Sequence, residues 1–260
     1  MKCKDMIEAL EKIAPSYLAE NWDNVGLLTG RLDKEIGKVM LALDPSGEVI
    51  EEAIREKVDM LITHHPLIFS GIKSVTRENF IGKRVYDLIR NDICYYAMHT
   101  NFDVMGMADA VADRLKLEKC RVLEITYKDE IGVEGIGRIG ELCRTMSLEE
   151  FAAYVKEKCD ITGMRIYGDP HQLVDVVALV PGSGKDYMTE AMKQKVDVFI
   201  TGDIGHHHGL DAIEQQLAVI DAGHYGLEKI FSSYMLEVLK REFPELLIKK
   251  AREQSPFWVI

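Results

Sequence analysis

Short apolar runs alternate along the chain with longer amphipathic stretches. Runs of four to seven residues are typical of buried strands, and stretches of ten or more with helical spacing are typical of helices. The expected strands are residues 39–43, 60–63, 93–98, 176–180, 198–201 and 218–221, and the expected helices are 6–14, 48–57, 84–90, 147–158, 187–195 and 225–241. This alternation predicts an α/β fold with mostly parallel sheets.

Two segments of the chain repeat one another. A shift of 138 residues pairs 39–63 with 177–201, and nine of the 25 positions are identical, among them Lys57-Val58-Asp59 with Lys195-Val196-Asp197. Two βαβ units can share apolar residues through composition alone, but the shared polar residues favour duplication. We expect two related α/β halves, 1–125 and 126–260, divided near a cluster of glycines, with the C-terminal helix and strand packing back on the first half.

The excess of acidic side chains bears on which partners the protein can bind. The chain has 260 residues, 43 acidic and 32 basic side chains, and a formal net charge of −11. This balance argues against binding nucleic acid or an anionic membrane through a general basic face. We expect a cytoplasmic protein, because no apolar stretch is long enough to span a membrane and residues 1–5 lack the apolar core of a signal peptide. The five cysteines include no Cys-x-x-Cys pair, so we expect them to be reduced and structural.

Polar side chains with metal-binding chemistry follow four of the expected strands. They are His64 and His65 after 60–63, His99 and Asp103 after 93–98, Asp203 and His206 after 198–201, and His224 and Glu228 after 218–221. In open α/β sheets the ligand crevice lies at the carboxyl ends of the strands. These side chains are therefore the candidate site residues.

Two pairs of these residues have suggestive spacing. His64 and His65 place two imidazoles at a strand end; an isolated pair of this kind is more often one buried histidine and one exposed one, but the other polar strand ends favour metal ligands. His224 and Glu228 are four residues apart and share one face if their segment is helical. Asp103 adds a carboxylate from a loop, or alternatively caps the helix that includes 108–115.

The five residues His64, His65, Asp103, His224 and Glu228 form a ligand set suited to two divalent ions of zinc, iron, manganese or nickel. His99 and Asp203 suit the orientation of the ligating rings. The run His206-His207-His208 opens a helix, and we expect one of its side chains, His206 or His207, to contact substrate or act as an acid or base. The residue that transfers a proton is expected to be His206, His207 or Asp203.

A glycine-rich segment, Pro181-Gly182-Ser183-Gly184-Lys185, lies between an expected strand and an expected helix. It departs from the Walker phosphate loop, because Leu179 and Asp186 stand where a glycine and a hydroxyl residue are required. Two interpretations stay open. The turn holds an anion through its backbone N–H groups, or it uses glycine for geometry alone.

These motifs resemble those of the Nif-three-like dinuclear-metal-centre proteins, often named GTP cyclohydrolase 1 type 2 homologs. The matching segments are 20–27 (ENWDNVGL), 63–69 (THHPLIF), 99–103 (HTNFD), 182–184 (GSG), 201–203 (TGD) and 221–228 (DAGHYGLE). The resemblance implies that the same five residues hold two metal ions, that the two halves are intertwined, and that the chain forms a toroidal homohexamer. The chain departs from some members in having no room for a domain inserted between the halves, and its run of three histidines is unusual.

The resemblance also implies a reaction. The expected activity is that of a two-metal hydrolase acting on a purine nucleotide such as GTP, which is opened at its imidazole ring, and a phosphate ester is the rival substrate. The alternative is a non-catalytic ring that stores or delivers metal or serves as a scaffold.

Overall fold

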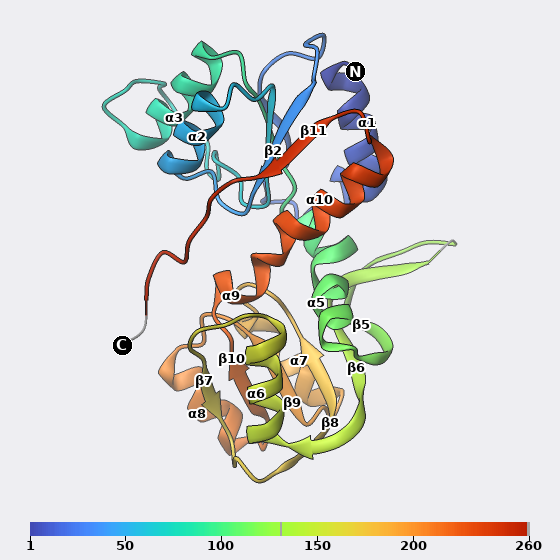
Figure 1. Ribbon diagram of the computed structural model, residues 1–260. Helices are drawn as coiled ribbons and strands as arrows, with labels where there is room; N and C mark the ends of the chain where they lie inside the picture. The colour runs from blue at the N-terminus through green and yellow to red at the C-terminus, as the bar shows by residue number, and fades with distance from the viewer. Residues whose placement is uncertain (131, 259–260) are drawn as a thin grey trace. The chain divides into compact units, whose positions relative to one another are not determined.

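The computed structural model describes residues 1–130 and 132–258. They form two compact units. The first comprises Met1–Phe102 and Phe231–Gln254, and the second comprises Asp103–Ile230 with the described residues after Gln254. Each unit contains one β-sheet and several helices (Figure 1). The α/β fold class expected from the hydrophobic pattern is confirmed.

The first unit is built on a five-stranded sheet in the order β1-β4-β3-β2-β11. Its strands are β1 (Gly26–Thr29), β2 (Lys38–Ala42), β3 (Met60–Thr63), β4 (Cys94–Ala97) and β11 (Leu247–Lys250). Its helices are α1 (Cys3–Ile13), α2 (Gly47–Arg55), α3 (Phe80–Arg90), α4 (Thr100–Phe102) and most of α10 (Ile230–Glu242), with a 3₁₀ turn at Ser16–Leu18. The four strands β4, β3, β2 and β11 pair in parallel, and β1 joins antiparallel at one edge. The carboxyl ends of β3 and β4 therefore lie next to each other.

The second unit is built on a six-stranded sheet in the order β5-β6-β8-β9-β10-β7. Its strands are β5 (Glu118–Lys128), β6 (Val133–Ser147), β7 (Arg165–Tyr167), β8 (Leu173–Leu179), β9 (Val198–Thr201) and β10 (Ala218–Asp221). Its helices are a π-helical segment (Asp103–Met107), α5 (Ala108–Leu115), α6 (Leu148–Lys158), α7 (Met188–Lys193) after a 3₁₀ turn at Lys185–Tyr187, α8 (His206–Glu214) and α9 (His224–Glu228). The central strands β8, β9 and β10 are parallel, and antiparallel strands extend the sheet on both sides.

Burial explains why the strands form where they do. Every residue of β3, β4, β9 and β10 is buried, as expected for continuous apolar runs covered by helices on both faces of a parallel sheet. In the second unit, α5 and α6 pack their apolar faces on β8, β9 and β10. The α6 helix begins with a capping box, in which Ser147 and Glu150 bond each other's backbone N–H groups.

The repeated sequence has a structural meaning. Asp59 and Asp197, which a shift of 138 residues pairs, each accept two consecutive backbone N–H groups. The donors are Gly37 and Lys38 at the start of β2, and Asp175 and Val176 within β8. The preceding lysines, Lys57 and Lys195, both adopt the left-handed conformation, with φ of 52° and 56°. The same carboxylate–backbone hydrogen bonds and the same left-handed lysine after a helix thus recur in both units, which fits duplication of a βαβ module.

The division of the chain and the long helix expected after residue 224 both differ from the expectation. Residue 125, the expected division between the halves, lies inside β5, and the compact units divide at Phe102 and again at Ile230. The expected helix 225–241 is two helices, α9 and α10, separated at Lys229. After α10 the chain adds β11 in parallel to β2.

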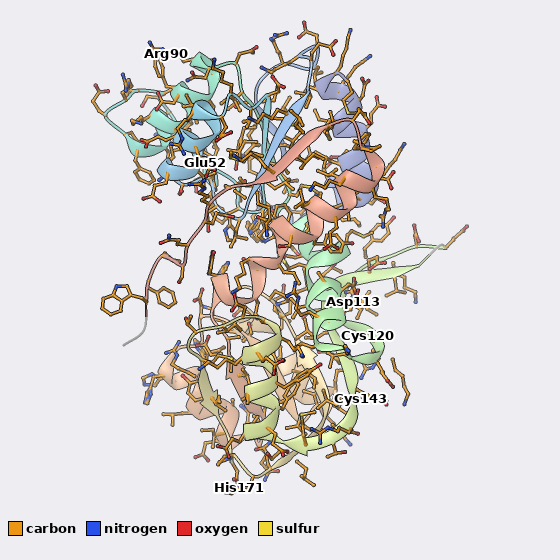
Figure 2. All side chains as sticks on the ribbon, in the orientation of Figure 1. Glu52, Arg90, Asp113, Cys120, Cys143 and His171 are labelled. Atoms are coloured by element: carbon orange, nitrogen blue, oxygen red, sulfur yellow. The ribbon has the colours of Figure 1, made fainter. Side chains whose placement is uncertain are left out.

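No helix within the described residues is both long and apolar enough to span a membrane. All five cysteines are free thiols. Three of them are buried, whereas Cys120 and Cys143 are exposed on the second unit (Figure 2).

Candidate metal centre

Three histidines gather at the carboxyl ends of β3 and β4 in the first unit. His64 and His65 follow β3, His99 follows β4, and one ligand atom of each lies within 4.8 Å of the others. The ring centroids are 4.9 Å apart for His64 and His65, 5.1 Å for His64 and His99, and 5.6 Å for His65 and His99. We call these three residues the histidine cluster.

The rings of the histidine cluster are all oriented in the same way. Each Nδ1 lies within hydrogen-bond distance of an oxygen that can only accept: the Met98 carbonyl for His64 (2.8 Å), Asp44 Oδ1 for His65 (2.7 Å) and Asp23 Oδ1 for His99 (2.9 Å). Nδ1 therefore carries the proton in the neutral ring, and the lone pair is on Nε2. Metal-ligating histidines have this arrangement, with the second nitrogen held by a carboxylate or carbonyl.

The turn that presents His64 and His65 is held by hydroxyl groups. The Thr63 hydroxyl donates to the His65 carbonyl at 2.6 Å, and the Tyr95 hydroxyl donates to the same carbonyl at 2.9 Å. The Tyr95 oxygen also accepts the Leu67 N–H at 2.8 Å. Two neighbouring imidazoles are thereby kept on one side of the strand end, where the alternation of a regular strand would separate them.

Asp44, which orients His65, is itself positioned by the C-terminal segment. The half-buried Glu253 carboxylate accepts the backbone N–H groups of Leu43 and Asp44 at 2.8 and 3.0 Å, and Ser232 Oγ donates to it at 3.3 Å. Burial raises the pKa of Glu253 above its ordinary value, although these hydrogen bonds favour the charged form. The segment after β11 therefore supports the site from more than 200 residues along the chain.

Asp23 is a buried carboxylate with several donors. Burial alone would raise its pKa, but hydrogen bonds from His99 and Thr100 lower the pKa from 3.8 to about 2. Thr100 donates both its N–H, at 2.9 Å, and its hydroxyl, at 2.6 Å. Asp23 therefore ties the loop before β1 to the residues after β4.

Replacing Asp23 with asparagine is expected to lower the free energy of unfolding by about 2 kcal/mol at pH 7. The folded pKa lies below the unfolded one, so the carboxylate stabilises the fold above about pH 4 and loses this contribution as the pH falls towards 2. Urea unfolding at several pH values measures the difference, which should shrink below pH 4. Asp33→Asn, at a side chain that is 75% exposed, is the control. A difference between Asp23→Asn and the original chain that stays constant from pH 7 to pH 3 would contradict this explanation.

The second unit presents a histidine and a carboxylate on one helical turn. His224 and Glu228 begin and end α9, and His224 Nε2 lies 2.8 Å from Glu228 Oε2. Asp203 Oδ2 lies 3.0 Å from His224 Nδ1, so His224 has the same carboxylate support as His65 and His99. Glu228 is only 3% exposed. The four-residue spacing seen in the sequence does place both side chains on one face.

Glycine in the 181–185 segment is needed for close approach to Glu228. Gly182 has a φ of +76°, and an added Cβ would lie 2.3 Å from Glu228 Oε1. The Gly184 N–H donates to Thr201 Oγ1 at 2.8 Å, and the Gly182 carbonyl accepts the Gly202 N–H at 2.8 Å. These polar groups serve the turn itself, which favours the interpretation that the glycines are there for geometry over the interpretation as an anion-binding loop.

Asp103 lies inside a helical run and does not cap one. It opens the π-helical segment that connects α4 to α5, and the residue at the N-cap position of α5 is Met107, whose side chain makes no capping bond. The alternative role as an N-cap for 108–115 is therefore wrong. π-Helical turns are frequent at functional sites because they displace a side chain from the regular helical face.

The run of histidines opens α8, as expected. His206, His207 and His208 are all exposed, and the rings of His206 and His207 are 5.4 Å apart and nearly perpendicular. Asp203, in the left-handed conformation with a φ of 58°, holds His224. The expected orienting role of Asp203 thus has a structural basis, and the proton-transfer role of these residues stays a prediction.

Two site residues were not assigned a role from the sequence. Asp44 and Asp23 support His65 and His99 through hydrogen bonds that join distant segments. The position of Asp23 within one of the matching motifs (ENWDNVGL) could have indicated a role in the site. For Asp44 the sequence offered only its position at the end of an expected strand. The structure also places His99 within the group of candidate ligands, where the sequence had suggested an orienting role.

The chain is similar to proteins of one family in sequence and in fold. The family model Duf34/NIF3 (NGG1p interacting factor 3) matches residues 1–256. A Clostridium acetobutylicum protein named GTP cyclohydrolase 1 type 2 homolog is 40% identical over 230 residues, which cover 88% of this chain and 85% of that protein. A Bacillus cereus protein related to NIF3 superposes with a TM-score of 0.92 at 25% identity, over 100% of this chain and 99% of that one. HcgD from Methanocaldococcus jannaschii, in its reduced form, has a TM-score of 0.82 at 35% identity, over 97% and 98% of the two chains. The resemblance read from the motifs is confirmed, and the chain belongs to the Duf34/NIF3 family.

Proposed function

We propose that the chain binds two divalent metal ions, of zinc, iron, manganese or nickel, through His64, His65, Asp103, His224 and Glu228. Three imidazoles and two carboxylates suit these borderline ions better than calcium, which prefers more oxygen ligands. The family resemblance supports the same five positions.

One observation carries this proposal. Histidines in both units are held by carboxylates at Nδ1, His65 by Asp44 at 2.7 Å and His224 by Asp203 at 3.0 Å. Such support fixes the tautomer whose Nε2 binds a metal and raises the basicity of the ring.

We further propose that the protein is a hydrolase that acts on a nucleotide-like substrate, as the name of the Clostridium relative suggests. Bound metal ions lower the pKa of a water molecule and polarise the bond that is broken. In this proposal Asp44, Asp23 and Asp203 keep the imidazoles oriented. His206, His207 or Asp203 transfers a proton to or from the substrate.

The experiment compares metal-loaded, chelator-treated and re-loaded protein against GTP and a generic phosphodiester. Turnover of GTP should fall by more than about 100-fold on chelation and return with added metal, as expected for metal-dependent chemistry. Nucleotide products are followed by chromatography, so ring opening and phosphate release are distinguished. Two bound ions per chain without turnover of any substrate would contradict the hydrolase proposal and favour metal storage or delivery.

The toroidal homohexamer stays a prediction from the family resemblance. Light scattering from the eluting protein measures its mass, and a mass of six chains is expected. A monomer that binds metal and turns over GTP would remove the ring from the proposal and leave the metal centre in place.

A further inference from the structure

Trp22 and Phe69 form an exposed aromatic pair in the first unit. The Trp22 side chain is 57% exposed and the Phe69 side chain is 56% exposed. Their ring centroids are 5.6 Å apart and the ring planes are tilted by 47°. A planar ligand can therefore stack on the exposed face of one ring and contact the other ring beside it.

The pair lies directly beside the histidine cluster. The His99 ring is 5.9 Å from the Trp22 ring and 6.3 Å from the Phe69 ring, edge-on to both. His99 in turn has a nitrogen within 4.8 Å of those of His64 and His65. A molecule resting on the aromatic pair is thus next to the candidate metal ligands.

The backbone beside each ring is fixed by hydrogen bonds. Asp23, which follows Trp22, is bonded to His99 and Thr100. The Asn24 side chain donates to the carbonyl of Ile68, the residue before Phe69, at 2.6 Å. The two loops are therefore tied to each other and to the histidine cluster, so little ordering is needed when a ligand binds.

The chemistry of this surface points to one class of ligand. Aromatic side chains hold nucleobases by stacking, and every base offers a π-face. The net charge of −11 disfavours recognition that depends on phosphate alone. Resting on the proposed function, we propose that Trp22 and Phe69 bind the planar heteroaromatic ring of the substrate and place it beside the histidine cluster.

The intrinsic fluorescence of Trp22 provides a direct probe. The chain has two tryptophans, so Trp258→Phe leaves Trp22 as the sole reporter. Guanosine and GTP are titrated into this variant loaded with zinc, with tripolyphosphate as the ligand that lacks a ring. Saturable quenching by guanosine and GTP, without quenching by tripolyphosphate, is expected.

Substitutions then test each ring. Trp22→Leu and Phe69→Leu should each raise the KM and the Kd for GTP about tenfold, while Trp22→Phe should retain most of the affinity. Metal content and oligomer mass should be unchanged. Phe80→Leu, at a phenylalanine on α3 that is 64% exposed, is the matched control and should behave like the original chain.

The outcomes separate this inference from the proposed function. GTP turnover with unchanged KM in Trp22→Leu and Phe69→Leu would overturn the inference and leave the hydrolase proposal intact. Quenching by tripolyphosphate equal to that by GTP would also overturn the inference. So would a changed oligomer mass with unaltered GTP affinity in the leucine variants, because the two rings would then form a contact between chains. Failure of the metal-loaded protein to bind any nucleotide would overturn both.

Discussion

Replacing His65 with alanine is expected to remove metal from the protein. We expect the metal content to fall from about two ions per chain to one or none. GTP turnover should fall by more than about 100-fold, because loss of a residue that only supports a metal ligand already costs up to about 100-fold and loss of a ligand should cost more. His65 is suited to this test because its side chain is 20% exposed, so its removal disturbs the core less than removal of the fully buried His64. Elemental analysis of the purified protein measures the metal content.

The companion variant is His224→Ala, which removes the corresponding donor from the second unit. The proposal requires both variants to lose metal, because both histidines are among the five proposed ligands. His171→Ala is the control, at an exposed histidine on the surface of the second unit (Figure 2). Unchanged metal content in a folded His65→Ala or His224→Ala protein would contradict the ligand assignment.

Gly182→Ala is expected to weaken metal binding about 100-fold, although it replaces none of the proposed ligands. An alanine Cβ would lie 2.3 Å from Glu228 Oε1, so the carboxylate has to move. The φ of +76° adds a backbone penalty of about 1 kcal/mol for any residue with a Cβ. Competition with a chromophoric zinc chelator measures the affinity.

The matched control is Gly132→Ala in the same unit. A Cβ at Gly132 meets no atom within 4 Å. Its zinc affinity should equal that of the original chain. If Gly182→Ala remains folded, as judged by circular dichroism, and binds zinc normally, then Glu228 is not a ligand or has room to move.

The buried parallel strands were predictable because their signal is local. The expected strands 60–63, 198–201 and 218–221 coincide with β3, β9 and β10, and every residue in them is buried. The capping box before α6 is similarly local, since it depends on two residues three positions apart. Helix ends were less accurate, as α2 and α7 end two residues before the expected limits.

Antiparallel and edge strands were missed because their signal is not local. β5 is mostly exposed and has no apolar run, so only its pairing with β6 defines it. β7 has three residues. A C-terminal strand was expected, but β11 contains two lysines, so no apolar run defined its bounds or its parallel pairing with β2. Long-range pairing of this kind cannot be read from periodicity.

The candidate ligands were predictable for a different reason. Histidine and carboxylate side chains at strand ends are rare enough that their positions alone suggested a metal centre, and parallel strands bring such ends together. The supporting carboxylates were not predictable, because Asp23 and Asp44 act through contacts with residues 76 and 21 positions away. The aromatic pair was equally hidden, since Trp22 and Phe69 meet only through the folded loops.

The most direct measurement is anomalous diffraction from crystals of the metal-loaded protein, collected at the absorption edge of the bound metal. The proposed ligand set requires two anomalous peaks per chain, each about 2 Å from ligand atoms of His64, His65, Asp103, His224 or Glu228. Peaks confined to the exposed His206-His207-His208 run would contradict this ligand set. So would the absence of peaks in crystals of protein that contains two metal ions per chain by elemental analysis.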